Sequence, residues 1–112
     1  MEIEYPKRHS EAEIESSLWF RLRQLKLDAR LQVKTIKSKL DVVVFKDSKA
    51  VCIVECKSWT KQYHLKQRYQ RAKNNKQITK YKELFGIPVY ICGYFSAIEP
   101  LSKIILDLYQ KS

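Results

Sequence analysis

The sequence predicts an α/β domain in which helices flank a mixed four-stranded sheet. Three observations support this: two β-branched runs joined by a polar turn, an apolar helical stripe before them, and a second helical stripe with a further apolar run after them. The expected order of elements is α-β-β-β-α-β plus a C-terminal helix, in a single domain over residues 1–112. A hairpin sheet crossed by a helix before a later strand implies a mixed sheet.

The first helix is expected to begin after Ser10. Ser10 and Glu13 have the spacing of a capping box, with Ser10 as N-cap and Glu13 at the third helical position. The apolar stripe then comprises Ile14, Leu18, Leu22 and Leu25. The helix should run to about Leu27.

Two acidic residues of this helix lie near its apolar stripe. At 100° per residue Glu11 falls inside the stripe and Glu15 beside it, while Glu13 points away. A carboxylate on the packing edge of a helix is costly unless it is paired or binds a metal. Compensation of the helix dipole is an alternative explanation for Glu11, and it applies less well to Glu15.

The central element is a hairpin. Ala29–Lys37 alternates apolar and polar residues and leads into it, and Leu40–Phe45 and Val51–Lys57 form its arms. Lys46–Ala50 is the turn. Folding the hairpin about Ser48 predicts the pairs Phe45–Val51, Val43–Ile53 and Asp41–Glu55.

Two carboxylates thus face each other at one end of an otherwise apolar hairpin face. The Cβ atoms of Asp41 and Glu55 would lie about 4.5–5.5 Å apart, where like charges are destabilising. Lys57, roughly 6–7 Å further along the strand, or a divalent metal ion must offset this repulsion. The alternative is a solvated charge ladder at a frayed hairpin end.

The rest of the chain supplies three further elements. A helix is expected over Arg68–Phe85, a short buried strand over Ile87–Tyr94 and a closing amphipathic helix over Ser96–Ser112. Between hairpin and helix, Ser58–Gln67 is a loop or the start of the helix. It carries Trp59, Tyr63 and His64. Trp59 either stacks on nucleic-acid bases or anchors the core.

Composition narrows the function classes. Three cysteines argue against a disulfide framework, and no apolar run approaches the ~18 residues of a membrane span. The charged N-terminus lacks the apolar centre of a secretory signal, so we expect a protein that stays inside the cell. His9 and His64 are isolated and have no metal-binding spacing.

The charge distribution favours a polyanionic partner. The net charge is +10, and the acid-free stretch 57–82 contains Lys57, Lys61, Lys66, Arg68, Arg71, Lys73, Lys76, Lys80 and Lys82. A basic surface around a local acidic spot suits a metal-dependent enzyme acting on a polyanion. An anionic membrane fits less well, because the basic residues do not lie opposite one apolar stripe.

Asp41 followed by Glu55-Cys56-Lys57, within this order of elements, resembles the PD-(D/E)XK nuclease superfamily. Glu15-Ser16-Ser17-Leu18-Trp19 looks like the E-x-x-L-W helix of small members related to the very-short-patch repair endonucleases. Gln77-Ile78-Thr79-Lys80-Tyr81 looks like the Q-x-x-x-Y helix of the exonuclease-type branch. The resemblance covers residues 10–94, and Leu40 stands where the motif has proline.

The resemblance implies a restriction-endonuclease-like fold and an assignment of roles. Glu15, Asp41 and Glu55 would bind Mg²⁺ with the backbone carbonyl of Cys56, and Mn²⁺ should substitute for it. Lys57 would be the catalytic lysine, orienting the attacking water and stabilising the anionic transition state. Gln77 would reach the site from its helix.

The expected function is therefore a Mg²⁺-dependent endonuclease that hydrolyses DNA, either double-stranded or branched, in a restriction-, repair- or junction-resolvase-like role. Its expected location is the cytoplasm, in association with the nucleoid in a bacterium or archaeon. A non-catalytic nucleic-acid-binding module on the same fold is the alternative, which the complete Asp41, Glu55 and Lys57 set disfavours. The closing helix, residues 99–111, either forms a homo-oligomer interface or packs on the sheet.

Overall fold

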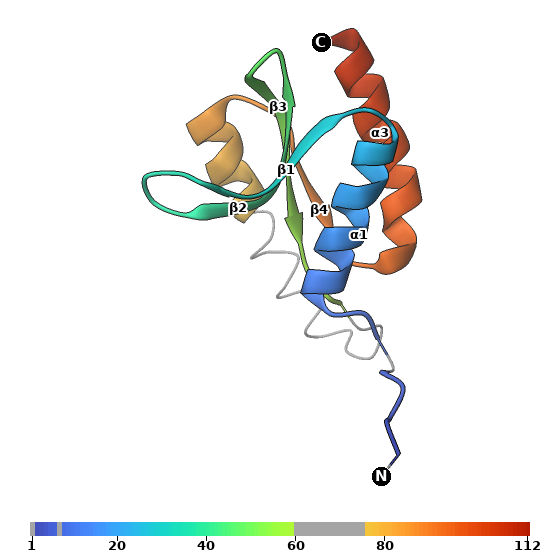
Figure 1. The fold of residues 1–112 in the computed structure, drawn as a ribbon. Coiled ribbons are helices and arrows are strands. Elements are labelled where there is room, and N and C mark those ends of the chain that lie inside the picture. The colour runs from blue at the N-terminus through green and yellow to red at the C-terminus, as the bar shows by residue number, and fades with distance from the viewer. Residues whose placement is uncertain (1, 7, 60–75) are drawn as a thin grey trace.

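A computed structural model of the 112-residue chain describes residues 2–6, 8–59 and 76–112. The described elements are α1 (Glu11–Gln24), β1 (Asp28–Lys34), β2 (Lys39–Lys46), β3 (Lys49–Cys56), a helix over residues 76–85, β4 (Val89–Cys92), the 3₁₀ turn η1 (Phe95–Ala97) and α3 (Ile98–Lys111). Figure 1 shows these elements as one layered unit with the N-terminal segment extending away from it.

The four strands form one mixed sheet in the order β1-β2-β3-β4. β1 and β3 each pair with β2 in antiparallel orientation, and β4 pairs with β3 in parallel orientation. α1 and α3 cover one face of the sheet, and the helix over 76–85 lies on the other (Figure 1). The predicted fold class, α/β with a mixed four-stranded sheet, helices and a C-terminal helix, is confirmed.

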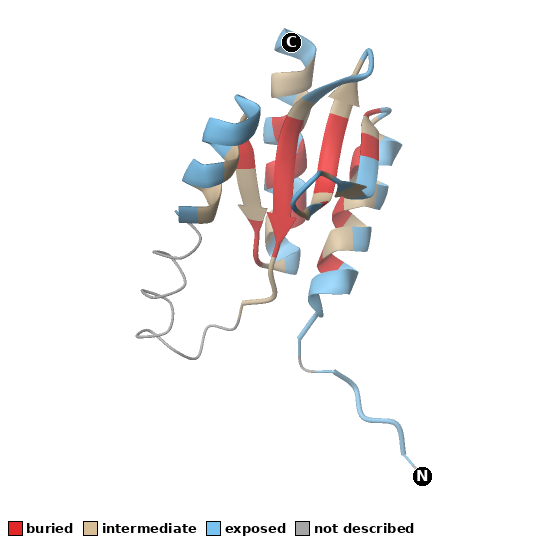
Figure 2. Cartoon of the chain, turned by 90° about the vertical axis from the view of Figure 1, so that its left-hand side faces the viewer, coloured by how far each residue is buried: buried red, intermediate tan, exposed pale blue. Residues whose placement is uncertain are grey.

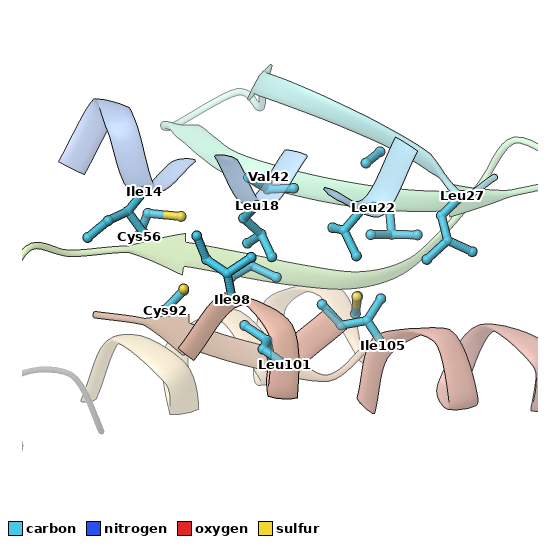
Figure 3. Packing of buried hydrophobic residues seen from close by; sticks show 14 residues of the cluster. Ile14, Leu18, Leu22, Leu27, Val42, Cys56, Cys92, Ile98, Leu101 and Ile105 are labelled. Carbon is cyan, nitrogen blue, oxygen red and sulfur yellow. The ribbon is translucent and has the colours of Figure 1, made fainter. Parts of the chain in front are cut away.

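Each sheet face has its own apolar cluster. The first cluster joins the sheet to α1 and α3 (Figure 3), and the second, smaller one joins it to the helix over 76–85. Burial is concentrated in the middle strands of the sheet (Figure 2). The second cluster consists of Leu40, Val43, Ile53 and Val89, with Val33, Phe45, Ile78, Tyr81 and Ile87 packed against it. The sheet therefore separates the two apolar layers.

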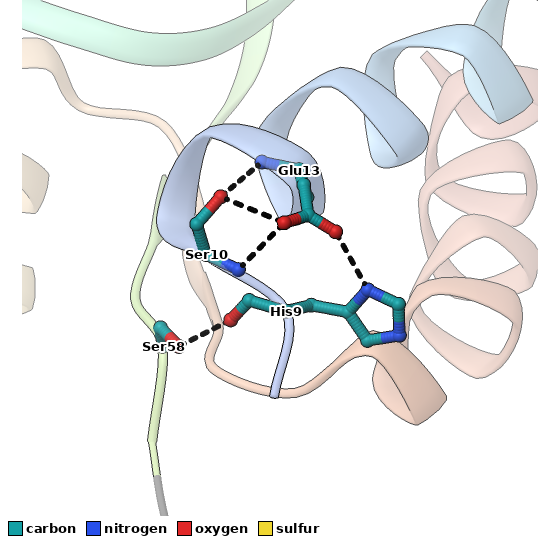
Figure 4. Close-up of polar contacts among 4 residues, drawn as sticks. All are labelled: His9, Ser10, Glu13 and Ser58. Carbon is teal, nitrogen blue, oxygen red and sulfur yellow. Dashed lines mark hydrogen bonds and ion pairs between the residues drawn. The ribbon is translucent and has the colours of Figure 1, made fainter. Parts of the chain in front are cut away.

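Helix α1 begins where its capping residues predict. The Glu13 backbone N–H donates to Ser10 Oγ over 3.1 Å, and the Glu13 carboxylate reaches back to the Ser10 backbone (Figure 4). Its buried stripe is Ile14, Leu18 and Leu22. The helix ends at Gln24, earlier than expected, because Lys26 adopts a left-handed backbone with φ of 67°.

The hairpin is tighter than predicted at its closed end. β2 runs to Lys46 and β3 starts at Lys49, so the turn contains only Asp47 and Ser48, both at positive φ. The pair Val43–Ile53 is confirmed. Phe45 pairs with Ala50 and not with Val51, because the register shifts between Val44 and Phe45.

The other strands and helices follow the expected order with shorter bounds. β1 ends at Lys34, since Thr35 and Ser38 close a turn through four hydrogen bonds of 2.7–3.2 Å. The described helix over 76–85 coincides with the end of the predicted Arg68–Phe85 helix, whose earlier part lies outside the described residues.

Helix α3 packs on the sheet. Ile98, Leu101 and Ile105 are buried in the first cluster, and the Glu99 carboxylate accepts two hydrogen bonds of 2.8 and 3.0 Å from the Arg21 guanidinium of α1. This confirms the packing role expected for the closing helix. None of the described helices is long and apolar enough to cross a membrane.

Candidate active site

The sheet forks at the two acidic residues of the hairpin. The ladder between β2 and β3 starts at the pair Val42–Val54. Beyond this pair, in the direction away from the hairpin turn, β2 is paired only with β1, and β3 is paired only with β4. Asp41 and Glu55 are the first residues beyond the pair, so the predicted facing positions lie where the two strands separate.

Asp41 occupies the fork through its side chain. The half-buried carboxylate accepts a hydrogen bond from the Cys56 backbone N–H, with Oδ2 2.8 Å from the nitrogen. If the ladder continued, the Cys56 N–H would donate to a backbone carbonyl of β2. Here it donates to the Asp41 side chain instead. The bond fixes the Asp41 carboxylate against the strand that carries Glu55.

Glu55 is buried, with 4% of its surface exposed. Burial, and next the negative charge of Asp41, raise its pKa to about 7, against a weaker opposing effect of Lys57. Its Oε1 is buried and accepts no hydrogen bond from any residue that the structure describes. Such an oxygen is costly unless a proton or a cation compensates it.

Glu15 is the helix acid that comes closest to this pair. It is half-buried on α1, and its Oε1 accepts a hydrogen bond of 2.5 Å from Gln32 Nε2. Burial raises the pKa of Glu15, the Gln32 bond opposes this, and the charge of Asp41 reinforces it. Glu11 is exposed in the first turn. The burial of Glu15 and its interaction with Asp41 favour it over Glu11, and its role as a ligand stays a prediction.

The sequence did not predict Gln32 as a site residue, because a single glutamine in a strand has no pattern that distinguishes it. Extending the hairpin register into β1 places it level with Asp41, because Leu31 pairs with Val42 and Val33 with Leu40. This placement depends on the register between β1 and β2. The loose alternation of apolar and polar residues in β1 does not specify that register.

Lys57 and Cys56 lie at the end of β3. Lys57 is half-buried, its backbone N–H donates to the Cys92 carbonyl over 2.9 Å, and its charge lowers the pKa of Glu55. The Cys56 thiol points into the first cluster, and burial raises its pKa far above the ordinary value. The thiol thus lies among apolar residues, and the ligand predicted from Cys56 is its backbone carbonyl.

Gln77 lies on the helix over 76–85, which covers the face opposite α1. It is half-buried, and within the described residues no hydrogen bond joins it to the carboxylates. Its predicted role therefore stays a prediction. An apolar groove of about 460 Å³ lies beside this helix, lined by residues including Ile36, Tyr81 and Phe85 and by none of the candidate acids.

Trp59 anchors the chain after β3. Its ring lies directly on Gly93, where an added Cβ would come within 2.2 Å of the ring, and it contacts Tyr94 edge-on. Trp59 thus packs against the segment after β4, and the alternative role in base stacking stays a prediction. His9 is a surface residue, bonded to Glu13 and stacked on Phe95, whereas Tyr63 and His64 lie outside the described residues.

The donors at the fork suit a hard cation. Carboxylate and carbonyl oxygens are what Mg²⁺ prefers, and it often takes only one or two carboxylates with water and substrate completing its shell. Across residues 2–6, 8–59 and 76–112, no three His, Cys, Asp or Glu side chains are gathered closely enough to hold a metal ion. The fork thus offers the buried Glu55 oxygen and the adjacent Asp41, without a preformed cage.

The chain is thus an α/β protein with a mixed sheet. Asp41 and Glu55 lie where its two central strands separate, and Lys57 follows directly after β3. Residues 4–93 match the family described as Type I restriction enzyme R protein N terminus (HSDR_N), and the chain belongs to this restriction-enzyme-related family. The match spans every candidate site residue and ends before α3. No curated protein and no solved structure matches the chain.

Proposed function

We propose that this chain is a Mg²⁺-dependent endonuclease domain that hydrolyses DNA phosphodiester bonds, on a restriction-endonuclease-like fold of the PD-(D/E)XK superfamily. The observation that carries the proposal is the fork, where Asp41 lies against β3 beside a buried Glu55. Two adjacent acids in a chain of net charge +10 have little use to a simple phosphate binder. They suit a cation that in turn contacts phosphate.

Asp41, Glu55 and the Cys56 carbonyl would hold the ion, with Glu15 beside them. When bound, Mg²⁺ would act as a Lewis acid toward the phosphate and lower the pKa of a water molecule. The Asp41 carboxylate is already oriented for this, because the Cys56 N–H holds one of its oxygens. Burial and the charge of Asp41 raise the pKa of the Glu55 carboxyl to about 7, and a bound cation would take the place of its proton.

Lys57 would stabilise the negative charge that builds on the phosphate oxygens and orient the attacking water. Its position directly after β3 and its electrostatic effect on Glu55 support this role. Gln77 would approach from the helix on the opposite face. The surrounding lysines and arginines would bind the DNA backbone, which makes affinity fall with salt.

DNA is the proposed substrate because the family is named for a subunit of a restriction enzyme. In a bacterium or archaeon, a DNA substrate would make the cytoplasm, in association with the nucleoid, the expected location of the protein. The basic composition and the acid-free stretch 57–82 fit a polyanion.

The test is cleavage of a supercoiled plasmid by purified protein with Mg²⁺, with Mn²⁺ and with EDTA. We expect cleavage with either ion, none with EDTA, and none from Asp41→Ala, which should still bind DNA. Asp107→Asn is the matched control, because Asp107 is an exposed acid on α3 paired with Lys111. Cleavage by Asp41→Ala at the wild-type rate, after removal of contaminating nucleases, would contradict the proposal.

A second candidate is a nucleic-acid-binding module without catalysis. One observation favours it: in the part of the chain that the structure describes, no three metal-ligating side chains are preassembled. The same plasmid experiment separates the two functions. A binding module would shift the DNA in a gel equally with Mg²⁺ and EDTA and leave it intact in both.

A further inference from the structure

Gln32 has a backbone conformation that is unusual inside a strand. Four non-glycine residues in the described part of the chain have positive φ: Lys26, Gln32, Asp47 and Ser48. Lys26 follows the end of α1, and Asp47 and Ser48 form the hairpin turn. Gln32, with φ of 51°, lies inside strand β1. A left-handed residue inside a strand is strained and persists where surrounding contacts hold it.

This conformation changes which way the strand faces. Ala29 belongs to the first cluster and Val33 packs against the second, although residues four apart in a regular strand share one face. The pairing with β2 is also interrupted, with Gln32 opposite Asp41 between two regular pairs. The strained residue is therefore level with the fork.

The Gln32 side chain makes one hydrogen bond within the described residues. Gln32 Nε2 donates to Glu15 Oε1 over 2.5 Å, a bond from the edge strand to helix α1. Gln32 itself is exposed, so burial of its side chain does not account for the strain. The carboxylate it holds is half-buried and close enough to Asp41 for the two charges to interact.

We infer that Gln32 is a positioning residue: its left-handed backbone aims its amide at Glu15 and holds that carboxylate toward Asp41 at the fork. It acts through Glu15 and itself contacts neither the ion nor the DNA. The inference rests on the proposed function, because it assigns Glu15 to the cation site. Partners that orient a metal ligand in this way commonly contribute about 10- to 100-fold to metal affinity.

Gln32→Asn is the sharpest variant. Asparagine tolerates the left-handed backbone and keeps the amide, but its side chain is one methylene, about 1.5 Å, shorter. We expect an unchanged thermal midpoint and about 10-fold weaker Mn²⁺ binding, measured by calorimetry without DNA. Gln32→Gly, which suits positive φ, should lose the same affinity with an equal or higher midpoint. Gln110→Asn, on the exposed side of α3, is the control and should match the wild type.

The Glu15→Gln background tests whether Gln32 acts through Glu15. There, Gln32→Asn should weaken Mn²⁺ binding no further. Wild-type Mn²⁺ affinity in Gln32→Asn, or losses that simply add in the double variant, would overturn the inference and leave the proposed function standing. A wild-type protein that neither binds Mn²⁺ nor cleaves DNA would overturn the proposed function, and the role of Gln32 with it.

Discussion

The two ends of the β2–β3 hairpin are built in opposite ways. At the closed end, a two-residue turn joins the strands, and backbone pairing continues from it, through one register shift, to the pairs Val43–Ile53 and Val42–Val54. At the open end, the strands separate, a side chain replaces backbone pairing, and a buried carboxylate oxygen has no donor within the described residues. Backbone pairing is kept through the closed end, whereas the fork gives up this pairing and buries a carboxylate within a few residues.

This difference indicates where stability and function lie. Departures from local rules tend to gather at functional sites, and the rest of the fold must compensate for them. Near the fork are the raised pKa of Glu55, the unpaired Gln32–Asp41 position and the strained φ of Gln32. Variants at the fork should therefore affect metal binding and catalysis, and variants in the paired part of the hairpin should affect folding.

The largest effect is expected from Lys57→Ala. Removing the ammonium that would stabilise the phosphate transition state should lower the cleavage rate by at least about 100-fold. The thermal midpoint and DNA binding should change little, because Lys57 is only half-buried and follows the last residue of β3. Plasmid cleavage and a gel-shift assay measure the two properties. Lys103→Ala, an exposed lysine on α3, is the control. Equal cleavage by both variants would remove Lys57 from the site.

In the paired stretch between the two ends, Ile53→Ala should lower the free energy of unfolding without a specific effect on catalysis. Ile53 is 1% exposed in the second cluster, so the cavity and the lost burial should cost about 2–5 kcal/mol of unfolding free energy. Urea unfolding measures this. The cleavage rate per folded molecule should stay near that of the wild type. If it fell as far as in Lys57→Ala, the contrast between the fork and the paired part of the hairpin would be lost.

Glu55→Gln should remove a pH dependence from the protein without metal. The pKa of Glu55 is near 7 when folded and ordinary, near 4.5, when unfolded, so the folded state holds the proton more tightly. The stabilisation from the protonated carboxyl is full below about pH 4.5 and is lost as the pH rises through 7. Relative to Glu55→Gln, the wild type should lose on the order of 3 kcal/mol over this range.

Urea unfolding of both proteins at pH 4.5 and pH 8, with EDTA, measures this difference. Adding Mg²⁺ at pH 8 should restore stability to the wild type and much less to the variant, because the ion replaces the proton on Glu55. A wild type and a variant with parallel pH profiles would mean that Glu55 is not buried as the fork requires.

The smallest effect is expected in the hairpin turn. Asp47 and Ser48 have φ of 51° and 66°, which glycine adopts without strain. Ser48→Gly should stabilise the protein by up to about 1 kcal/mol and raise the thermal midpoint by a few degrees. Cleavage should not change. Destabilisation would show that the turn is not the two-residue form seen here.

Much of the fold follows from local patterns. The capping box of Ser10 and Glu13, the buried stripe of α1 and the Val43–Ile53 pair were all predicted, because each depends on residues close in sequence or on a single hairpin. The same alternation predicted that Cys52 and Cys56 lie away from Glu55 as free, buried thiols. It also placed Asp41 and Glu55 at the same level of the hairpin.

The sequence by itself thus determined the order of elements, the first helix and the meeting of two acids across the central hairpin. Only the tertiary structure decided that the ladder ends at those acids, that Phe45 pairs with Ala50, that Glu15 is half-buried, and that Gln32 donates a hydrogen bond to Glu15. The physical reason is that periodicity specifies which side of an element a residue occupies. Strand separation, a register shift and a bond between an edge strand and a helix depend instead on how distant segments pack together.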